Sequence, residues 1–324
     1  MDSISLIRTP IEAELRDFKE LFDSSLSSSN ALLDSVVSHI RQRNGKMMRP
    51  ILVLLVARLY GAVCPSTLHA AVSLELLHTA SLVHDDVVDE STERRGQLSV
   101  NAIFNNKVAV LTGDYLLATS LVHAELTNSH RIIQLVSTLG QDLADGELLQ
   151  LSNVSNRKYH LLSGSRYQYI RPTNGLVRLL PPLHLPKKRQ LSYRRQKERQ
   201  SSYELHQSKP PQKSYDYFDN REIGKPTGND MLEGKLTLPA LYVLNTTKND
   251  EAQELAIKVK EGTATPDEIA RLISFIKENG GIEYAVQTMN VYKQKAFDLL
   301  ASLPESDICV ALRAYLDYVV DREK

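Results

Sequence analysis

The sequence predicts an all-α protein built as one helical bundle. Apolar residues recur at the three- and four-residue spacing of amphipathic helices along most of the chain, and no convincing run of alternating strand residues interrupts them. With 324 residues, of which 42 % are hydrophobic, the chain is long enough to bury a sizeable core. We therefore expect a single domain over residues 1–324.

The predicted helices follow one another along the chain with short breaks. Pro50 is a favourable first-turn residue. Thr265, with Pro266 and Glu268, forms a capping box, and Asn279-Gly280-Gly281 ends the helix that it starts. The apolar pattern predicts helices at 11–26, 31–43, 50–61, 67–89, 108–126, 130–152, 236–244, 265–278, 284–300 and 307–322.

The composition excludes several classes of protein. No apolar run reaches the roughly 18–20 residues that a membrane-spanning helix needs, and the first residues lack a secretory signal. Two cysteines, Cys64 and Cys309, are too few for a disulfide scaffold or a cysteine-based zinc site. Basic and acidic residues are equal in number, at 39 each, so the whole chain has no charge-driven affinity for nucleic acid. We expect a soluble cytoplasmic protein.

Residues 155–215 differ from the rest of the chain. This segment holds 14 Lys or Arg, two acids and six of the 13 prolines, but no alanine and no aspartate. Its charge of +12 balances a charge of −12 elsewhere. The prolines would end or kink any helix. By itself the segment is typical of a basic, proline-rich linker.

An acidic motif near the end of the predicted helix 67–89 carries the main chemical signal. Asp85 and Asp89 are four residues apart, which places their carboxylates on one helix face, with Asp86 adjacent. Clustered oxygen ligands of this kind suit Mg²⁺, which completes its shell with water and substrate phosphate oxygens. A solvated acidic helix end is the alternative interpretation.

Cationic residues accompany the acidic motif. Arg94 and Arg95 follow shortly after Asp89, and arginine binds phosphate oxygens through two parallel hydrogen bonds. Lys46 and Arg49 stand at a predicted helix start, where backbone N–H groups also favour anions. His78 lies two helical turns before Asp85, as a further phosphate ligand or as a core histidine. This combination suits a diphosphate substrate.

The motifs together resemble the trans-polyprenyl diphosphate synthases. The resemblance covers about residues 10–154 and 216–324. It implies an isoprenoid-synthase bundle around a central cavity, and an enzyme that condenses isopentenyl diphosphate head to tail with an allylic diphosphate. The segments that carry the resemblance are Leu74–Asp89, Arg94–Gly96, Leu111–Leu117, Gly224–Asp230 and Glu233–Pro239.

The resemblance also implies roles for individual residues. Asp85 and Asp89 would hold Mg²⁺ on the allylic diphosphate, with Asp86 beside them and Asp216 as a further metal ligand. Small residues at Ala80 and Ser81 would leave the product channel open, which implies a long-chain product, well beyond farnesyl length; close helix packing is the alternative reason for their size. The residues implied in diphosphate binding are Arg94 for the allylic substrate, Lys46, Arg49, His78 and Arg95 for isopentenyl diphosphate, and Lys225 and Lys235 for the leaving diphosphate.

The sequence departs from the family pattern in three places. Met47 replaces a basic residue, and a lysine-threonine motif expected before the second aspartate motif is missing. In the second aspartate motif, Gln212 and Lys213 occupy the first two aspartate positions, and Lys213 would repel Mg²⁺. We interpret residues 155–215 as a stretch read out of frame, which replaces core helices and impairs this chain. A genuine basic insertion or a linker is the alternative.

Two functions therefore remain open from the sequence. The first is a long-chain prenyltransferase, impaired in this chain. The second is a non-catalytic homologue or regulatory subunit that retains only the first diphosphate–Mg²⁺ site. The resemblance implies a homodimer. We expect no nucleic-acid partner, and contact with membranes only at the surface, through a lipid product.

Overall fold

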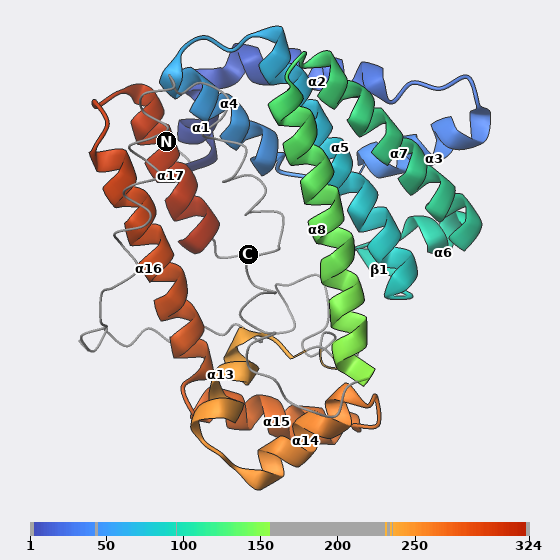
Figure 1. Cartoon of the computed structure of the whole chain (residues 1–324), viewed down its shortest axis with the longest axis vertical. Helices are drawn as coiled ribbons and strands as arrows, with labels where there is room; N and C mark the ends of the chain where they lie inside the picture. Colours follow the sequence, from blue (N-terminus) through green and yellow to red (C-terminus); the bar gives the residue numbers. More distant parts are fainter. Residues whose placement is uncertain are drawn as a thin grey trace.

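The computed structural model describes residues 3–42, 45–94, 96–155, 231, 234 and 236–321, with the backbone alone for 149–155 and 321. Regular structure in these ranges is almost entirely helical, which confirms the predicted class (Figure 1). The elements are α1 (Ser3–Arg8), η1 (Thr9–Ile11), α2 (Glu12–Ser25), α3 (Ala31–Gln42), α4 (Met48–Tyr60), α5 (Pro65–Val88), β1 (Glu93–Arg94), β2 (Gln97–Leu98), α6 (Val100–Phe104), α7 (Asn106–Leu126), α8 (His130–Ser155), α13 (Leu238–Thr246), α14 (Asp250–Lys260), α15 (Pro266–Glu278), α16 (Gly281–Ala301) and α17 (Asp307–Asp321).

Helices α5 and α7 form the most extensive helix–helix contact in the described part of the chain. Small residues let them approach closely: Ser120 Oγ donates to the Ser73 carbonyl at 2.7 Å, and both serines are fully buried. Pro65 starts α5 after an extended Cys64, and the Asn105 side chain caps α7 by accepting the Val108 N–H. The pair forms a rigid support for the end of α5 that carries the acidic motif.

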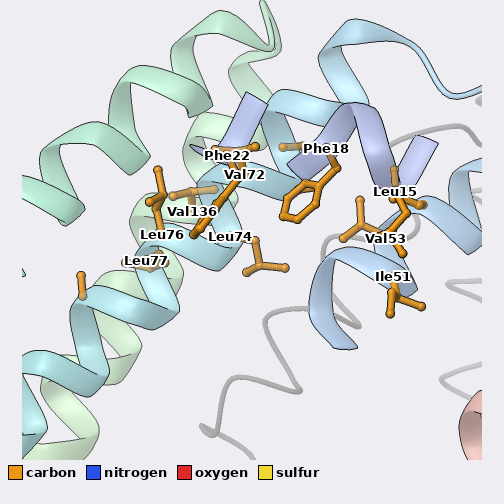
Figure 2. Close-up of a cluster of buried hydrophobic side chains, with 14 of the residues drawn as sticks. Leu15, Phe18, Phe22, Ile51, Val53, Val72, Leu74, Leu76, Leu77 and Val136 are labelled. Atoms are coloured by element: carbon orange, nitrogen blue, oxygen red, sulfur yellow. The ribbon is translucent and has the colours of Figure 1, made fainter. Parts of the chain in front are cut away.

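The main hydrophobic core lies between α2, α4, α5 and α8 (Figure 2). Phe18 and Phe22 of α2 stack with ring centroids 5.8 Å apart, in the same cluster as Ile51 of α4 and Leu74 of α5. Phe18 is 0 % exposed. Burying an aromatic side chain of this size stabilises a fold by about 2–3 kcal/mol. This core fixes α4 against α5.

A second, smaller core joins α13, α14 and α15 at the other end of the molecule. The capping box that starts α15 is formed as predicted: Thr265 N–H donates to Glu268 Oε2 at 2.9 Å, and Glu268 N–H donates to Thr265 Oγ1 at 3.3 Å. Tyr242 of α13 stacks on Tyr284 of α16 at 3.9 Å between centroids. Helix α16 thus connects this core to the main bundle.

The first and last helices lie together against the start of the bundle. Helix α17 contacts α1 and α4, so the two ends of the described chain flank the N-terminal turn of α4 (Figure 1). Tyr315 of α17 is buried there and donates its hydroxyl to the Met48 carbonyl at 3.0 Å.

The structure differs from the sequence-based expectations in small elements. Helices α1, α6 and α14 were not expected. A short antiparallel hairpin pairs Arg94 with Gln97 and Glu93 with Leu98. No helix among the described residues is long and apolar enough to cross a membrane. Most of the segment 155–215, including the predicted loss of core helices there, lies outside the described residues.

Candidate functional site

Asp85 and Asp89 lie one turn apart at the C-terminal end of α5. Asp89 caps the helix, and its N–H donates to the Asp85 carbonyl at 2.8 Å. Both residues are half-buried, at the border between the core and solvent. The spacing predicted from the sequence therefore does place the two residues one above the other on α5.

Asp86 has a different environment from its two neighbours. It is 1 % exposed, and its Oδ1 accepts a hydrogen bond from Arg94 Nε at 2.6 Å. This short, charge-assisted contact holds Arg94 at the same end of α5 as Asp85 and Asp89. The guanidinium keeps its other N–H donors, and its side chain is 19 % exposed. Asp86 thus positions an arginine.

A hydrogen-bond network fixes the turn that connects Asp86 to Arg94. Ser91 N–H and Asn101 Nδ2 donate to the Asp86 carbonyl, at 2.9 and 3.2 Å. Asn101 Nδ2 and Ser99 Oγ both lie within hydrogen-bonding distance of the Ser91 carbonyl, at 3.1 and 2.7 Å. Ser91, Ser99 and Asn101 were not predicted as site residues. A signal for them in one sequence is weak, because serine and asparagine are common in any turn.

His84 is anchored on α7. Its Nε2 lies 3.2 Å from the Val110 carbonyl oxygen and 3.3 Å from Asp114 Oδ1. Both are acceptors, so Nε2 carries the proton in this arrangement. The ring packs over Gly113, where a Cβ would lie 2.2 Å from Nε2. His84 is therefore a packing group that ties the turn before the acidic motif to α7.

His78, Ala80 and Ser81 lie further back on α5. His78 is half-buried, two turns before Asp85, and its carbonyl accepts a hydrogen bond from Ser81 Oγ at 2.8 Å. Ala80 is 2 % exposed and belongs to the main core.

Lys46 and Arg49 stand at the start of α4. Lys46 is exposed in the turn before the helix, and Arg49 is half-buried in its first turn. Met47 between them adopts a left-handed backbone, with φ of 50°. Three residues that the sequence analysis did not identify hold this turn in place: Arg8, Tyr315 and Tyr318. Arg95, Asp216, Lys225 and Lys235 lie outside the described residues.

The donor set at the end of α5 suits a divalent metal shared with a substrate. No group of three or more His, Cys, Asp or Glu residues capable of holding a metal occurs in the described ranges. Asp85 and Asp89 are the other two carboxylates of the acidic motif, one turn apart at this end of α5. Mg²⁺ is commonly bound through one or two carboxylates with substrate phosphates and water. The residues present fit such an ion.

Comparison with known proteins identifies the family. The polyprenyl synthetase family model matches residues 30–173. The component 2 of heptaprenyl diphosphate synthase from Geobacillus stearothermophilus is 30 % identical over 96 % of both chains. The chain belongs to the polyprenyl synthetase family. The family match ends inside the basic segment 155–215.

Solved polyprenyl synthetases share the fold over almost the whole chain. A geranylgeranyl pyrophosphate synthase from Bacteroides thetaiotaomicron is 56 % identical, with a TM-score of 0.78 over 99 % of this chain and 100 % of that one. A polyprenyl synthase from Caulobacter crescentus CB15, solved with calcium and isoprenyl diphosphate, is 24 % identical, with a TM-score of 0.76 over 99 % of this chain and 98 % of that one. The expected isoprenoid-synthase fold is thereby confirmed.

Proposed function

We propose that this protein is a trans-prenyltransferase that joins isopentenyl diphosphate to an allylic diphosphate. The observation that carries the proposal is the end of α5, where Asp85 and Asp89 stand one turn apart beside an arginine that a buried aspartate orients. The 56 % identity to a geranylgeranyl pyrophosphate synthase supports the same substrate class.

In this proposal each residue has a defined task. Asp85 and Asp89 would hold Mg²⁺, which when bound would neutralise charge on the departing diphosphate. Arg94, oriented by Asp86, binds oxygens of the allylic diphosphate, and Lys46 and Arg49 bind the second diphosphate. His78 is proposed as a further ligand of isopentenyl diphosphate. Arg95, Lys225, Lys235 and Asp216 keep their implied roles as diphosphate and metal ligands, outside the described residues.

The proposal is tested by product formation. The purified chain is incubated with Mg²⁺, farnesyl diphosphate and isotope-labelled isopentenyl diphosphate, and extended products are measured by mass spectrometry. Asp85→Asn and Asp89→Asn should each lower turnover by at least about a hundredfold. Asp34→Asn, at an exposed acid of α3, is the matched control and should leave turnover unchanged. Normal turnover in Asp85→Asn would contradict the assigned metal site.

The product is proposed to be longer than farnesyl diphosphate, because the resemblance implies that small residues at Ala80 and Ser81 leave room for chain growth. Ala80 is packed within the main core, so the proposal depends on Ser81. Ser81 is half-buried, so Ser81→Phe is the better test of the two positions. A bulky ring there should shorten the main product, measured by mass spectrometry. An unchanged product length would favour the alternative, in which small residues only permit close helix packing.

A second candidate function is a non-catalytic subunit that binds diphosphate. Gln212 and Lys213, at positions expected for metal-binding aspartates, favour it. The Geobacillus relative is named as one component of a synthase. Resequencing codons 150–220 separates the candidates: compensating indels support an active synthase with an intact second motif, whereas a confirmed reading frame supports the non-catalytic candidate.

The protein is also proposed to act as a homodimer in the cytoplasm. One face of α7 exposes apolar side chains at helical spacing, with Leu111 68 % and Val122 56 % exposed, and a second copy of the same face would cover them. Light scattering should give twice the mass of one chain. The double substitution Leu111→Lys, Val122→Lys should give one chain mass, and a monomeric wild type would contradict the dimer.

A further inference from the structure

The turn that carries Lys46 is held from outside by the two ends of the described chain. Arg8, the last residue of α1, donates from Nη2 to the Lys46 carbonyl at 3.3 Å. Tyr315 of α17 donates its hydroxyl to the Met48 carbonyl at 3.0 Å. Lys46 Nζ lies 5.1 Å from the centroid of the Tyr318 ring, also on α17. Helices at opposite ends of the sequence thus meet at one short turn.

This turn needs external support. Met47 is the residue before α4 and adopts a left-handed backbone conformation, which is unfavourable for residues other than glycine and asparagine. Its side chain makes no capping hydrogen bond to the helix. The hydrogen bonds from Arg8 and Tyr315 to the carbonyls on either side of Met47 offset that strain.

Tyr318 acts on the Lys46 side chain itself. A lysine side chain has many rotamers, and ordering it on binding an anion loses conformational entropy. An ammonium above an aromatic ring is attracted by the ring's negative face. The ring therefore restricts Lys46 before a ligand arrives. The Tyr318 hydroxyl is buried and has no hydrogen-bond partner among the described residues, so the ring is the functional part.

We propose that Tyr318 and Tyr315 of the C-terminal helix are positioning residues for isopentenyl diphosphate, acting through Lys46 and the first turn of α4. The inference rests on the proposed function, because it takes Lys46 as a ligand of that diphosphate. The inference adds Tyr315 and Tyr318, which belong to none of the sequence motifs and lie about 270 residues after the turn that they hold.

Binding to the full chain tests the proposal without requiring turnover. Isopentenyl diphosphate and, separately, farnesyl diphosphate with Mg²⁺ are titrated by calorimetry. Tyr318→Leu should weaken isopentenyl diphosphate binding about three- to tenfold and leave farnesyl diphosphate binding unchanged. Tyr318→Phe keeps the ring and should retain most of the affinity. Tyr315→Phe should weaken binding about threefold, since it removes one hydrogen bond.

A matched control and a double variant sharpen the test. Tyr292→Leu removes the same kind of contact from an exposed part of α16, where Lys295 Nζ lies 5.2 Å from the Tyr292 ring, and should change nothing. In a Lys46→Ala background, Tyr318→Leu should have no further effect, because the ring acts through that lysine.

The outcomes distinguish the positioning role of the tyrosines from the proposed function on which it rests. If Lys46→Ala weakens isopentenyl diphosphate binding but Tyr318→Leu does not, the positioning role is wrong and the proposed function stands. If Tyr318→Leu weakens both ligands equally, its effect is a general loss of structure, and the positioning role is again wrong. If wild type does not bind isopentenyl diphosphate, or Lys46→Ala binds it as wild type does, both proposals fail.

Discussion

A single methyl group at Gly113 should disrupt the contact between α5 and α7 next to the acidic motif. A Cβ at this position would lie 2.2 Å from Nε2 and 2.4 Å from Cδ2 of His84. Both distances are far inside van der Waals contact. In Gly113→Ala the imidazole must therefore leave its place, and it loses the Val110 carbonyl at 3.2 Å and the Asp114 carboxylate at 3.3 Å.

The size of the effect follows from three terms. The clash is with the end of the half-exposed His84 side chain, which can rotate away, so the remaining overpacking costs about 1 kcal/mol, the low end of the usual range. The lost polar contacts of a partly exposed ring add about 1 kcal/mol. Alanine is favoured over glycine in a helix interior by about 1 kcal/mol, which offsets the second term. The expected net loss of unfolding free energy in Gly113→Ala is about 1 kcal/mol.

The effect of Gly113→Ala on the unfolding free energy should change sign when His84 is absent. In a His84→Ala background no ring opposes the new methyl group, so Gly113→Ala should stabilise the protein by about 0.5–1 kcal/mol. Urea unfolding of wild type, both single variants and the double variant gives the coupling directly. Gly140→Ala in α8 is the matched control, since nothing lies within 4 Å of its Cβ. Equal effects of Gly113→Ala in the two backgrounds would refute this explanation.

Three further predictions concern the buried polar groups and a helix cap. Burial, and the charge of the neighbouring His69, lower the pKa of His123 to about 4 from its usual 6.5, so the unfolded chain takes up a proton first as the pH falls. Unfolding free energy should drop by about 2 kcal/mol between pH 7 and pH 5, and His123→Gln should flatten this dependence; an equal slope in the variant would contradict it. Asp86→Asn leaves Arg94 without its charge partner. We expect it to lower the unfolding free energy by about 1–3 kcal/mol and to weaken farnesyl diphosphate binding. Unchanged binding would show that Asp86 has no role in the diphosphate site. Thr265→Ala removes the α15 cap and should lower the urea midpoint by the equivalent of about 1 kcal/mol, while Thr263→Ala, just before the cap, should have a smaller effect.

The sequence predicted the long helices well because their signals are local. The capping box at Thr265 and Glu268 depends on residues three apart, and the structure forms it as expected. Helix α5 begins at Pro65 and ends at Val88, close to the predicted 67–89. Helix α14 and the hairpin at Glu93 were missed. In α14 the buried residues Ala252, Leu255, Ala256 and Val259 do follow the helical spacing, but two of them are alanines, so the apolar stripe is weak. A strand of two residues has no period to detect.

The candidate site was predictable only where spacing along one helix decides it. The relative positions of Asp85 and Asp89 follow from their spacing of four residues along one helix. The pairing of Asp86 with Arg94 does not, because it depends on how the chain turns after α5 ends. The contact of Tyr318 with Lys46 depends on the packing of α17 beside α4, which no local pattern encodes.

The two halves of the proposed mechanism can be separated experimentally. The residues that we propose for binding the allylic diphosphate lie together at the end of α5, whereas the positions of the second aspartate motif carry Gln212 and Lys213. If residues 155–215 are out of frame, the chain as written should bind farnesyl diphosphate with Mg²⁺ yet turn over poorly. Breaking the allylic C–O bond would need the charge of the departing diphosphate neutralised at both proposed metal sites. A gene with the frame restored should recover turnover with little change in that binding. Full turnover by the chain as written would contradict the out-of-frame interpretation, and loss of binding would place the defect at Asp85 and Asp89 instead.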